Sequence, residues 1–225
     1  MKKLFAMTGV VLAVLVCTAF VGQQTPAPPL ANHSAAGPCN APCPVFNLDP
    51  KGDSPLATIT KPTDNACKAG MKNGLAVPDP KCTPGAINPT LTLEVLKDTK
   101  FRTCCVRDGF ESEQAKKIVY KWYGITDPPD NVGANQVCEL DHLVSLELGG
   151  ADSLDNVWPQ CGPDAVTLQN RYFKQKDFVE DYLAAQVRNG GITLEAAQKG
   201  IASDWTQYLT TAKTYCATNK CEGGS

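Results

Sequence analysis

Histidine is scarce in this chain, and several common catalytic patterns are absent. Only two histidines occur among 225 residues, His33 and His142. The sequence contains no internal repeat, which argues against a solenoid, and no glycine-rich loop of the kind that cradles nucleotide phosphates. It also contains no Ser-His-Asp set, which argues against a serine hydrolase. Any histidine chemistry in the folded part of the chain therefore depends on His142.

An excess of positive charge is also missing. The chain has 21 Lys and Arg against 23 Asp and Glu, a net charge of −2. If Lys2 and Lys3 are removed with a leader, two positive charges are lost and the net charge becomes −4, because no acidic residue precedes Asp49. Such a protein lacks the overall positive field that attracts nucleic acid, so nucleic-acid binding would need a local basic groove.

The cysteines contain no Cys-x-x-Cys pair, which disfavours a zinc knuckle. Eleven cysteines occur, and without Cys17 in the leader the remaining ten form an even set. In an exported chain an even set indicates disulfides, each of which contributes about 2–4 kcal/mol to stability.

The N-terminus is typical of an exported protein. Met-Lys-Lys followed by an apolar run predicts a signal peptide over residues 1–22, with an uncleaved membrane anchor as the alternative. We expect a Pro/Ala-rich linker over 23–38, a cysteine-containing, loop-rich segment over 39–81 and the main domain over 82–225. The mature protein is therefore predicted to be secreted or periplasmic, without stable membrane association.

The stretch from 138 to 160 has the strongest chemical pattern. Asp141 and His142 end a short apolar run, Gly149-Gly150 predicts a turn, and Asn156 opens a second apolar run. This spacing predicts an antiparallel hairpin. Taken singly, the Asp-His pair is also typical of a surface salt link, and the asparagine of a turn.

The order Glu-Leu-Asp-His, Leu-Glu-Leu-Gly-Gly, Asn, Trp-Pro resembles the HNH (ββα-metal, His-Me finger) nuclease superfamily, in particular exported bacterial members. The resemblance implies that His142 is the general base, a role that suits a neutral imidazole near pH 7. It implies that Asp141 and Asn156 supply oxygen ligands to Mg²⁺ (or Mn²⁺). The implied substrate is nucleic acid, DNA in preference to RNA.

The third position of the HNH pattern, on the helix after the hairpin, is not a histidine here. Asn170, Lys174 and Asp177 lie in the corresponding region, and the sequence does not choose among them. The same helix offers Arg171, Lys174 and Lys176 as weak candidates for nucleic-acid contacts.

Helical periodicity appears on both sides of the hairpin. Apolar spacing predicts helices over 111–123 and 166–188, and a last helix from Thr193 with one apolar face reaching Ala212. Residues 91–95 alternate as in a strand, although 93–96 also fit a helical turn, and 57–60 is a strand-like run. The predicted fold class is α+β, a ββα-metal hairpin-plus-helix unit packed by flanking helices and stapled by disulfides.

The hairpin also predicts one disulfide. Paired positions in an antiparallel hairpin have a constant sum of residue numbers, so if Asp141 faces Trp158, Cys138 faces Cys161. The alternative is a bond from Cys138 to one member of the Cys104-Cys105 pair.

The predicted function is that of an exported, metal-dependent, HNH-like endonuclease. The alternative is a secreted, disulfide-rich binding or envelope protein that kept the scaffold and lost the chemistry. The Asp-His pair and the asparagine favour the enzyme, whereas the missing helix ligand and the acidic charge favour the alternative.

Overall fold

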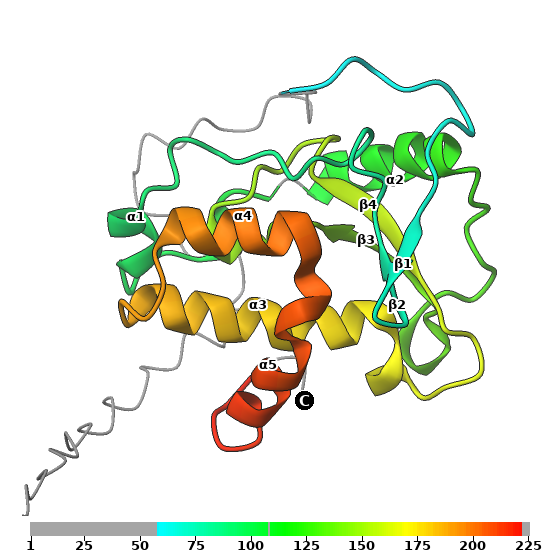
Figure 1. Ribbon diagram of the computed structural model, residues 1–225. Coiled ribbons are helices and arrows are strands. Elements are labelled where there is room, and N and C mark those ends of the chain that lie inside the picture. Colours follow the sequence, from blue (N-terminus) through cyan, green and yellow to red (C-terminus); the bar gives the residue numbers. More distant parts are fainter. Residues whose placement is uncertain (1–57, 108, 222–225) are drawn as a thin grey trace, which may run out of the picture.

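The computed structural model describes residues 58–107 and 109–221; the predicted signal peptide with Cys17, the predicted linker, and the start of the 39–81 segment with Cys39 and Cys43 lie outside this range. The fold is α+β, with helices packed around two small antiparallel strand pairs (Figure 1). The strands are β1 Gly70–Lys72, β2 Leu75–Val77, β3 Cys138–His142 and β4 Val157–Cys161. The helices are α1 Leu93–Lys97, α2 Gly109–Tyr123, α3 Tyr172–Arg188, α4 Leu194–Asp204 and α5 Leu209–Cys216. Short 3₁₀ turns lie at Thr103–Cys105, Gly133–Asn135, Leu146–Leu148, Leu168–Asn170 and Trp205–Tyr208.

The predicted hairpin is present in the predicted register. Strands β3 and β4 pair antiparallel, with Asp141 opposite Trp158 and Cys138 opposite Cys161. Cys138 and Cys161 form a disulfide, so the alternative bond to the Cys104-Cys105 pair is excluded. The bridge closes the open end of the hairpin and fixes the register in which His142 ends β3.

Helix α3 follows the hairpin and begins later than the sequence predicted. A 3₁₀ turn, Leu168–Asn170, precedes it, and Arg171 adopts an extended conformation (φ −66°, ψ 149°). The Arg171 guanidinium donates a hydrogen bond to the Pro163 carbonyl, which stabilises this extended entry into the helix. The first turns of α3 therefore start against the end of β4.

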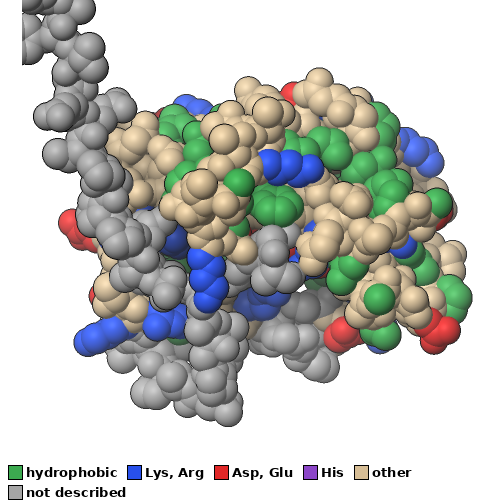
Figure 2. All heavy atoms as spheres, turned by 90° about the horizontal axis from the view of Figure 1, so that it is seen from below, with side chains coloured by type: hydrophobic (Ala, Val, Ile, Leu, Met, Phe, Trp, Pro, Cys, Tyr) green, Lys and Arg blue, Asp and Glu red, His purple; other side chains and the backbone are tan. Residues whose placement is uncertain are grey.

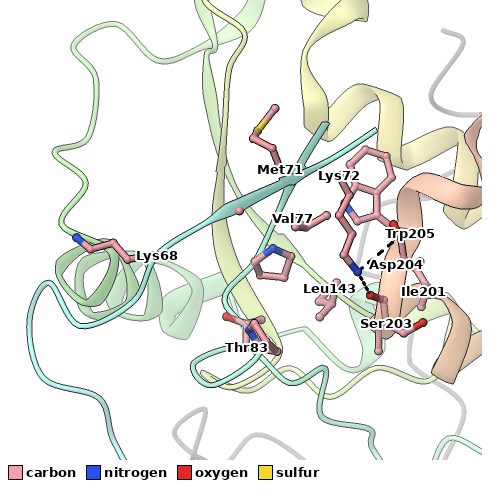
Figure 3. A pocket seen from close by; sticks show the side chains of 14 residues that line it. Lys68, Met71, Lys72, Val77, Thr83, Leu143, Ile201, Ser203, Asp204 and Trp205 are labelled. Atoms are coloured by element: carbon pink, nitrogen blue, oxygen red, sulfur yellow. Dashed lines mark hydrogen bonds and ion pairs between the residues drawn. The ribbon is translucent and has the colours of Figure 1, made fainter. Parts of the chain in front are cut away.

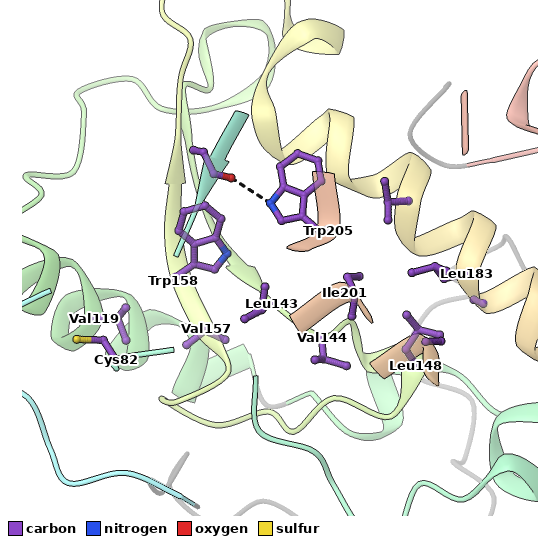
Figure 4. Close-up of a cluster of buried hydrophobic side chains, with 14 of the residues drawn as sticks. Cys82, Val119, Leu143, Val144, Leu148, Val157, Trp158, Leu183, Ile201 and Trp205 are labelled. Atoms are coloured by element: carbon purple, nitrogen blue, oxygen red, sulfur yellow. Dashed lines mark hydrogen bonds between the residues drawn. The ribbon is translucent and has the colours of Figure 1, made fainter. Parts of the chain in front are cut away.

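The core lies between the hairpin and the helices (Figure 4). Trp122, Trp158 and Trp205 are at most 1% exposed, and the Trp205 indole N–H donates to the Ala76 carbonyl at 3.0 Å. Burying three aromatic rings of this size removes a large apolar area from water. That bond also joins β2 to the C-terminal half of the chain.

The segment before residue 82 is more regular than the sequence indicated. Strands β1 and β2 form a hairpin whose two turn residues, Asn73 and Gly74, both have positive φ. An Asn-Gly pair favours this tight turn, so the signal was present in the sequence. A Cys67–Cys82 disulfide joins this segment to the rest of the core, whereas residues 58–60 of the strand-like run form no strand.

The predicted last helix is interrupted. Thr193 caps α4 as predicted, accepting a bond from the Ala196 N–H at 3.2 Å. Asp204 then leaves the helical conformation (φ −167°, ψ 90°), and its carboxylate accepts from the N–H and the hydroxyl of Thr206. This new cap restarts the chain as a 3₁₀ turn and α5, which lets Trp205 enter the core.

Two remaining features complete the fold. Of the alternatives at residues 91–95, the helical one is correct, because Thr92 caps α1. A Cys216–Cys221 disulfide closes the chain after α5. Within residues 58–107 and 109–221, no helix has the length and apolar character needed to cross a membrane.

We predict that the hairpin disulfide stabilises the fold more than the C-terminal one. The Cys138–Cys161 bridge spans 23 residues and Cys216–Cys221 spans 5. Loop-closure entropy then gives losses of about 3 and about 2 kcal/mol for the respective double serine variants. Denaturant unfolding measures both, and an equal or reversed order would contradict the prediction.

Candidate active site

His142 lies at the end of β3 beside an acidic side chain from the following loop. Its ring nitrogen Nε2 is 2.7 Å from Oδ1 of Asp152, and the two side chains are 11% and 15% exposed. No hydrogen bond joins the other ring nitrogen, Nδ1, to any residue that the structure describes. An imidazole oriented by a carboxylate, with one nitrogen available, is suited to accept a proton.

Asp152 was not foreseen as a site residue. It lies ten residues after His142 in a loop that begins with Gly149-Gly150. Gly150 is required there, because a Cβ atom would lie 1.8 Å from the Val144 carbonyl oxygen. The close approach of Gly150 to Val144, just after β3, brings Asp152 near the end of that strand. The glycine pair was therefore the sequence signal for this contact.

Asn156 holds the same loop closed. Its side-chain oxygen accepts from the Val144 N–H at 3.0 Å, and its amide nitrogen donates to the carbonyls of Val144 (2.9 Å) and Ala151 (2.8 Å). The residue is fully buried. These three bonds engage the amide with backbone groups on both sides of the loop, so its oxygen is directed at an N–H group.

Asp155 is a second buried loop residue that the sequence analysis missed. One carboxylate oxygen accepts from the N–H and the hydroxyl of Thr58, each at 2.7 Å, and the other accepts from the Ser153 hydroxyl at 2.7 Å. Charge-assisted bonds of this kind are strong. Asp155 therefore ties the hairpin loop to the chain before β1.

Asp141 faces a lysine of α3. The Lys176 ammonium lies 2.9 Å from Oδ2 of Asp141, forms a close ion pair with Glu180 and donates to the His142 carbonyl at 2.6 Å. The Lys176 side chain is fully buried. The residue predicted as a nucleic-acid contact is thus an internal cation that joins α3 to β3.

The surrounding charges are mostly acidic. Burial lowers the pKa of Lys176, but the carboxylates of Asp141 and Glu180 outweigh it and raise the pKa above its ordinary value. Burial raises the pKa of Glu139 to about 7, with further contributions from Asp141 and Asp177. Burial also raises the pKa of Asp177 and of Glu180 against the attraction of nearby lysines.

The other predicted helix residues are dispersed. Asn170 is exposed and donates to the Thr167 hydroxyl at 3.1 Å. Lys174 and Asp177 pair with each other at 3.0 Å with side chains 27% and 24% exposed, whereas Arg171 is 4% exposed. Of the three predicted cations only Lys174 reaches the surface. On the face seen in Figure 2, Lys and Arg side chains are dispersed among other types.

The predicted ligands do not fit a Mg²⁺ or Mn²⁺ site in this conformation. The Asp141 carboxylate pairs with Lys176, and the Asn156 oxygen accepts a backbone N–H. The described part of the chain contains no group of three or more His, Cys, Asp or Glu side chains that could hold a metal ion. A hard cation needs oxygen ligands that are directed at one point. The Asp141 oxygen is directed at the Lys176 ammonium and the Asn156 oxygen at the Val144 N–H.

A pocket of about 280 Å³ lies elsewhere, between the β1–β2 hairpin and the end of α4 (Figure 3). Leu143, Ile201 and Trp205 line it. The ammonium of Lys72, at its edge, donates to the Ser203 carbonyl at 2.7 Å. None of Asp141, His142, Asp152 or Lys176 contributes to its walls. The pocket is therefore separate from the candidate active site.

No protein-family model, curated protein or solved structure matches the chain.

We predict that Asn156 is needed for stability in the absence of any metal. Asn156→Ala removes the partners of two buried backbone groups of Val144 and of the partly buried Ala151 carbonyl, and should lower the free energy of unfolding by about 2–4 kcal/mol in the presence of a chelator. Asn170→Ala, at the exposed asparagine, should change it by less than about 0.5 kcal/mol. Wild-type stability of Asn156→Ala under these conditions would contradict the loop role.

Glu139 should make the fold less stable above neutral pH. Its folded-state pKa, about 7, lies above the ordinary value of 4.5, so its stabilising effect is present below the ordinary value and is lost as pH rises through 7. The substituted side chain of Glu139→Gln cannot ionise. The free energy of unfolding of this variant should therefore rise relative to that of wild type by on the order of 2 kcal/mol as the pH increases from about 5 to about 8. Chemical denaturation at both pH values measures this.

The Glu195→Gln variant is the control for that comparison, because the exposed carboxyl group of Glu195 pairs with Lys199, which lowers its pKa, the direction opposite to that of Glu139. Equal pH dependence in Glu139→Gln and wild type would show that Glu139 does not carry the effect.

Proposed function

We propose that this chain is an exported hydrolase of phosphodiester bonds, with DNA preferred over RNA, in which His142 is the general base. The observation that carries the proposal is the 2.7 Å contact between His142 Nε2 and Asp152 Oδ1. An ionised carboxylate only accepts hydrogen bonds, so Asp152 would keep the proton on Nε2 and leave the lone pair of Nδ1 for a water molecule.

The reaction requires a base that works near neutral pH and a ring that water can reach. His142 is partly exposed at the end of a strand. When the ring takes a proton from the attacking water, the Asp152 carboxylate stabilises the resulting imidazolium. The substrate class is supported by the resemblance of the Glu-Leu-Asp-His and Leu-Glu-Leu-Gly-Gly stretches to HNH nucleases. Three disulfides among the described residues are compatible with a secreted or periplasmic protein.

A binding protein that uses the same scaffold without catalysis is the second candidate. The Asn156 side chain is hydrogen-bonded to the backbone of the loop, and Lys176 pairs with Asp141. Neither residue therefore presents its polar group to a substrate. In that function the buried charges serve only to hold α3 against the hairpin.

We predict that His142→Ala lowers the rate of plasmid nicking by roughly 10²–10⁴-fold, because the water loses its base. The thermal midpoint should stay within a few degrees of wild type, since the substitution removes one side-chain hydrogen bond, to the partly exposed Asp152. His33→Ala, the same change at the other histidine, is the matched control and should keep full activity. Equal nicking by His142→Ala and wild type would assign the activity to a contaminant or to other residues.

Asp152→Asn tests the orienting carboxylate. An amide can donate to Nε2 and so favours the wrong tautomer, which should lower the rate by roughly 10²-fold or more. Each variant is assayed with Mg²⁺ and with a chelator. No cleavage by well-folded wild type under either condition would favour the binding function over the enzyme.

A further inference from the structure

The Lys176 ammonium makes two hydrogen bonds, to the His142 carbonyl and to Glu180, and one ion pair, with Asp141, all inside the protein. An ammonium group has three N–H donors. In this structure three oxygens face it, one each from Asp141, Glu180 and the His142 main chain. The side chain is fully buried, so water does not compete for these oxygens. The charge of the ammonium is therefore balanced inside the protein by Asp141 and Glu180.

The oxygens around Lys176 surround one cation, the ammonium itself. Two carboxylates and a carbonyl oxygen directed at one point are the ligand types that hard cations take in proteins, with water completing the shell. Burying an ammonium is costly unless charges and hydrogen bonds compensate it, and here both are present. The resemblance to HNH nucleases implies a divalent ion at Asp141, the same carboxylate that Lys176 contacts.

We infer that Lys176 is the resident cation at Asp141, in place of a divalent metal ion, and that a divalent ion is held at Asp141 and Glu180 only when the ammonium is removed. Lys176 is then a positioning residue, because its buried ammonium cannot reach a substrate. Its bond to the His142 carbonyl fixes the end of β3, from which the His142 ring extends.

Lys176 would occupy this place whether or not His142 is catalytic, so metal binding, and not cleavage, is the measurement. The full chain is titrated with Mn²⁺ after chelator treatment, and bound ion is followed by its paramagnetic signal. Wild type should show no saturable binding that depends on Asp141. Lys176→Ala should bind Mn²⁺ at least about tenfold more tightly than wild type, since two carboxylates lose their internal partner.

Thermal midpoints provide the second readout. Lys176→Ala should melt below wild type, and millimolar Mg²⁺ or Mn²⁺ should raise its midpoint because the ion binds only the folded state. Adding Asp141→Asn to Lys176→Ala should abolish that rise. Lys174→Ala is the matched control on the same helix, since Lys174 pairs with Asp177 at the surface; metal should not raise its midpoint.

Wild type alone can overturn the inference. Saturable Mn²⁺ binding by wild type that Asp141→Asn removes would show that the metal, and not the ammonium, is resident at Asp141. If Lys176→Ala does not fold without metal, it is refolded with and without Mn²⁺. Refolding of the variant only with Mn²⁺ supports the proposal that a divalent ion can take the place of the ammonium. Failure to refold under both conditions contradicts it.

Discussion

The ion pair between Lys176 and Asp141 is the interaction on which the site depends. Its lysine is fully buried, and the pair links the first half of α3 to the strand that ends at His142. The Lys176 ammonium also donates a hydrogen bond to the His142 carbonyl. If α3 moved away from β3, this ammonium would lose its partners in the core. The Cys138–Cys161 bridge fixes the register of the strands, and the lysine fixes the helix beneath them. The ring of His142 is therefore supported from two sides.

The parts predicted from the sequence were those set by local geometry. The register of β3 and β4, the hairpin disulfide and the Thr193 cap follow from spacing that any antiparallel pair or helix start must obey. The roles of Asn156 and Lys176 could not be read in this way. A buried asparagine binds a backbone amide as readily as a metal, and lysine is usually exposed, so only tertiary packing decides both. The same holds for the helix break at Asp204, where packing of the next tryptophan overrides an unbroken apolar stripe.

The candidate chemistry is concentrated in two layers. His142 and Asp152 are partly exposed and form a pair suited to proton transfer, whereas the Lys176 ammonium is fully buried and balances the charges of Asp141 and Glu180. Burial raises the pKa of Glu139, with smaller contributions from the carboxylates of Asp141 and Asp177, so the acidic groups around β3 make the stability of the fold sensitive to pH. This division fits a hydrolase whose base is oriented by a rigid support, and it equally supports a binding protein that has lost the reaction.

The most direct test of the account is a crystal structure of the protein grown with millimolar Mn²⁺, with diffraction data collected at the manganese absorption edge. The account predicts that the Lys176 ammonium lies within ion-pair distance of Asp141 and Glu180 and that no anomalous peak occurs beside them. A manganese peak coordinated by Asp141, with Lys176 turned away, would contradict it.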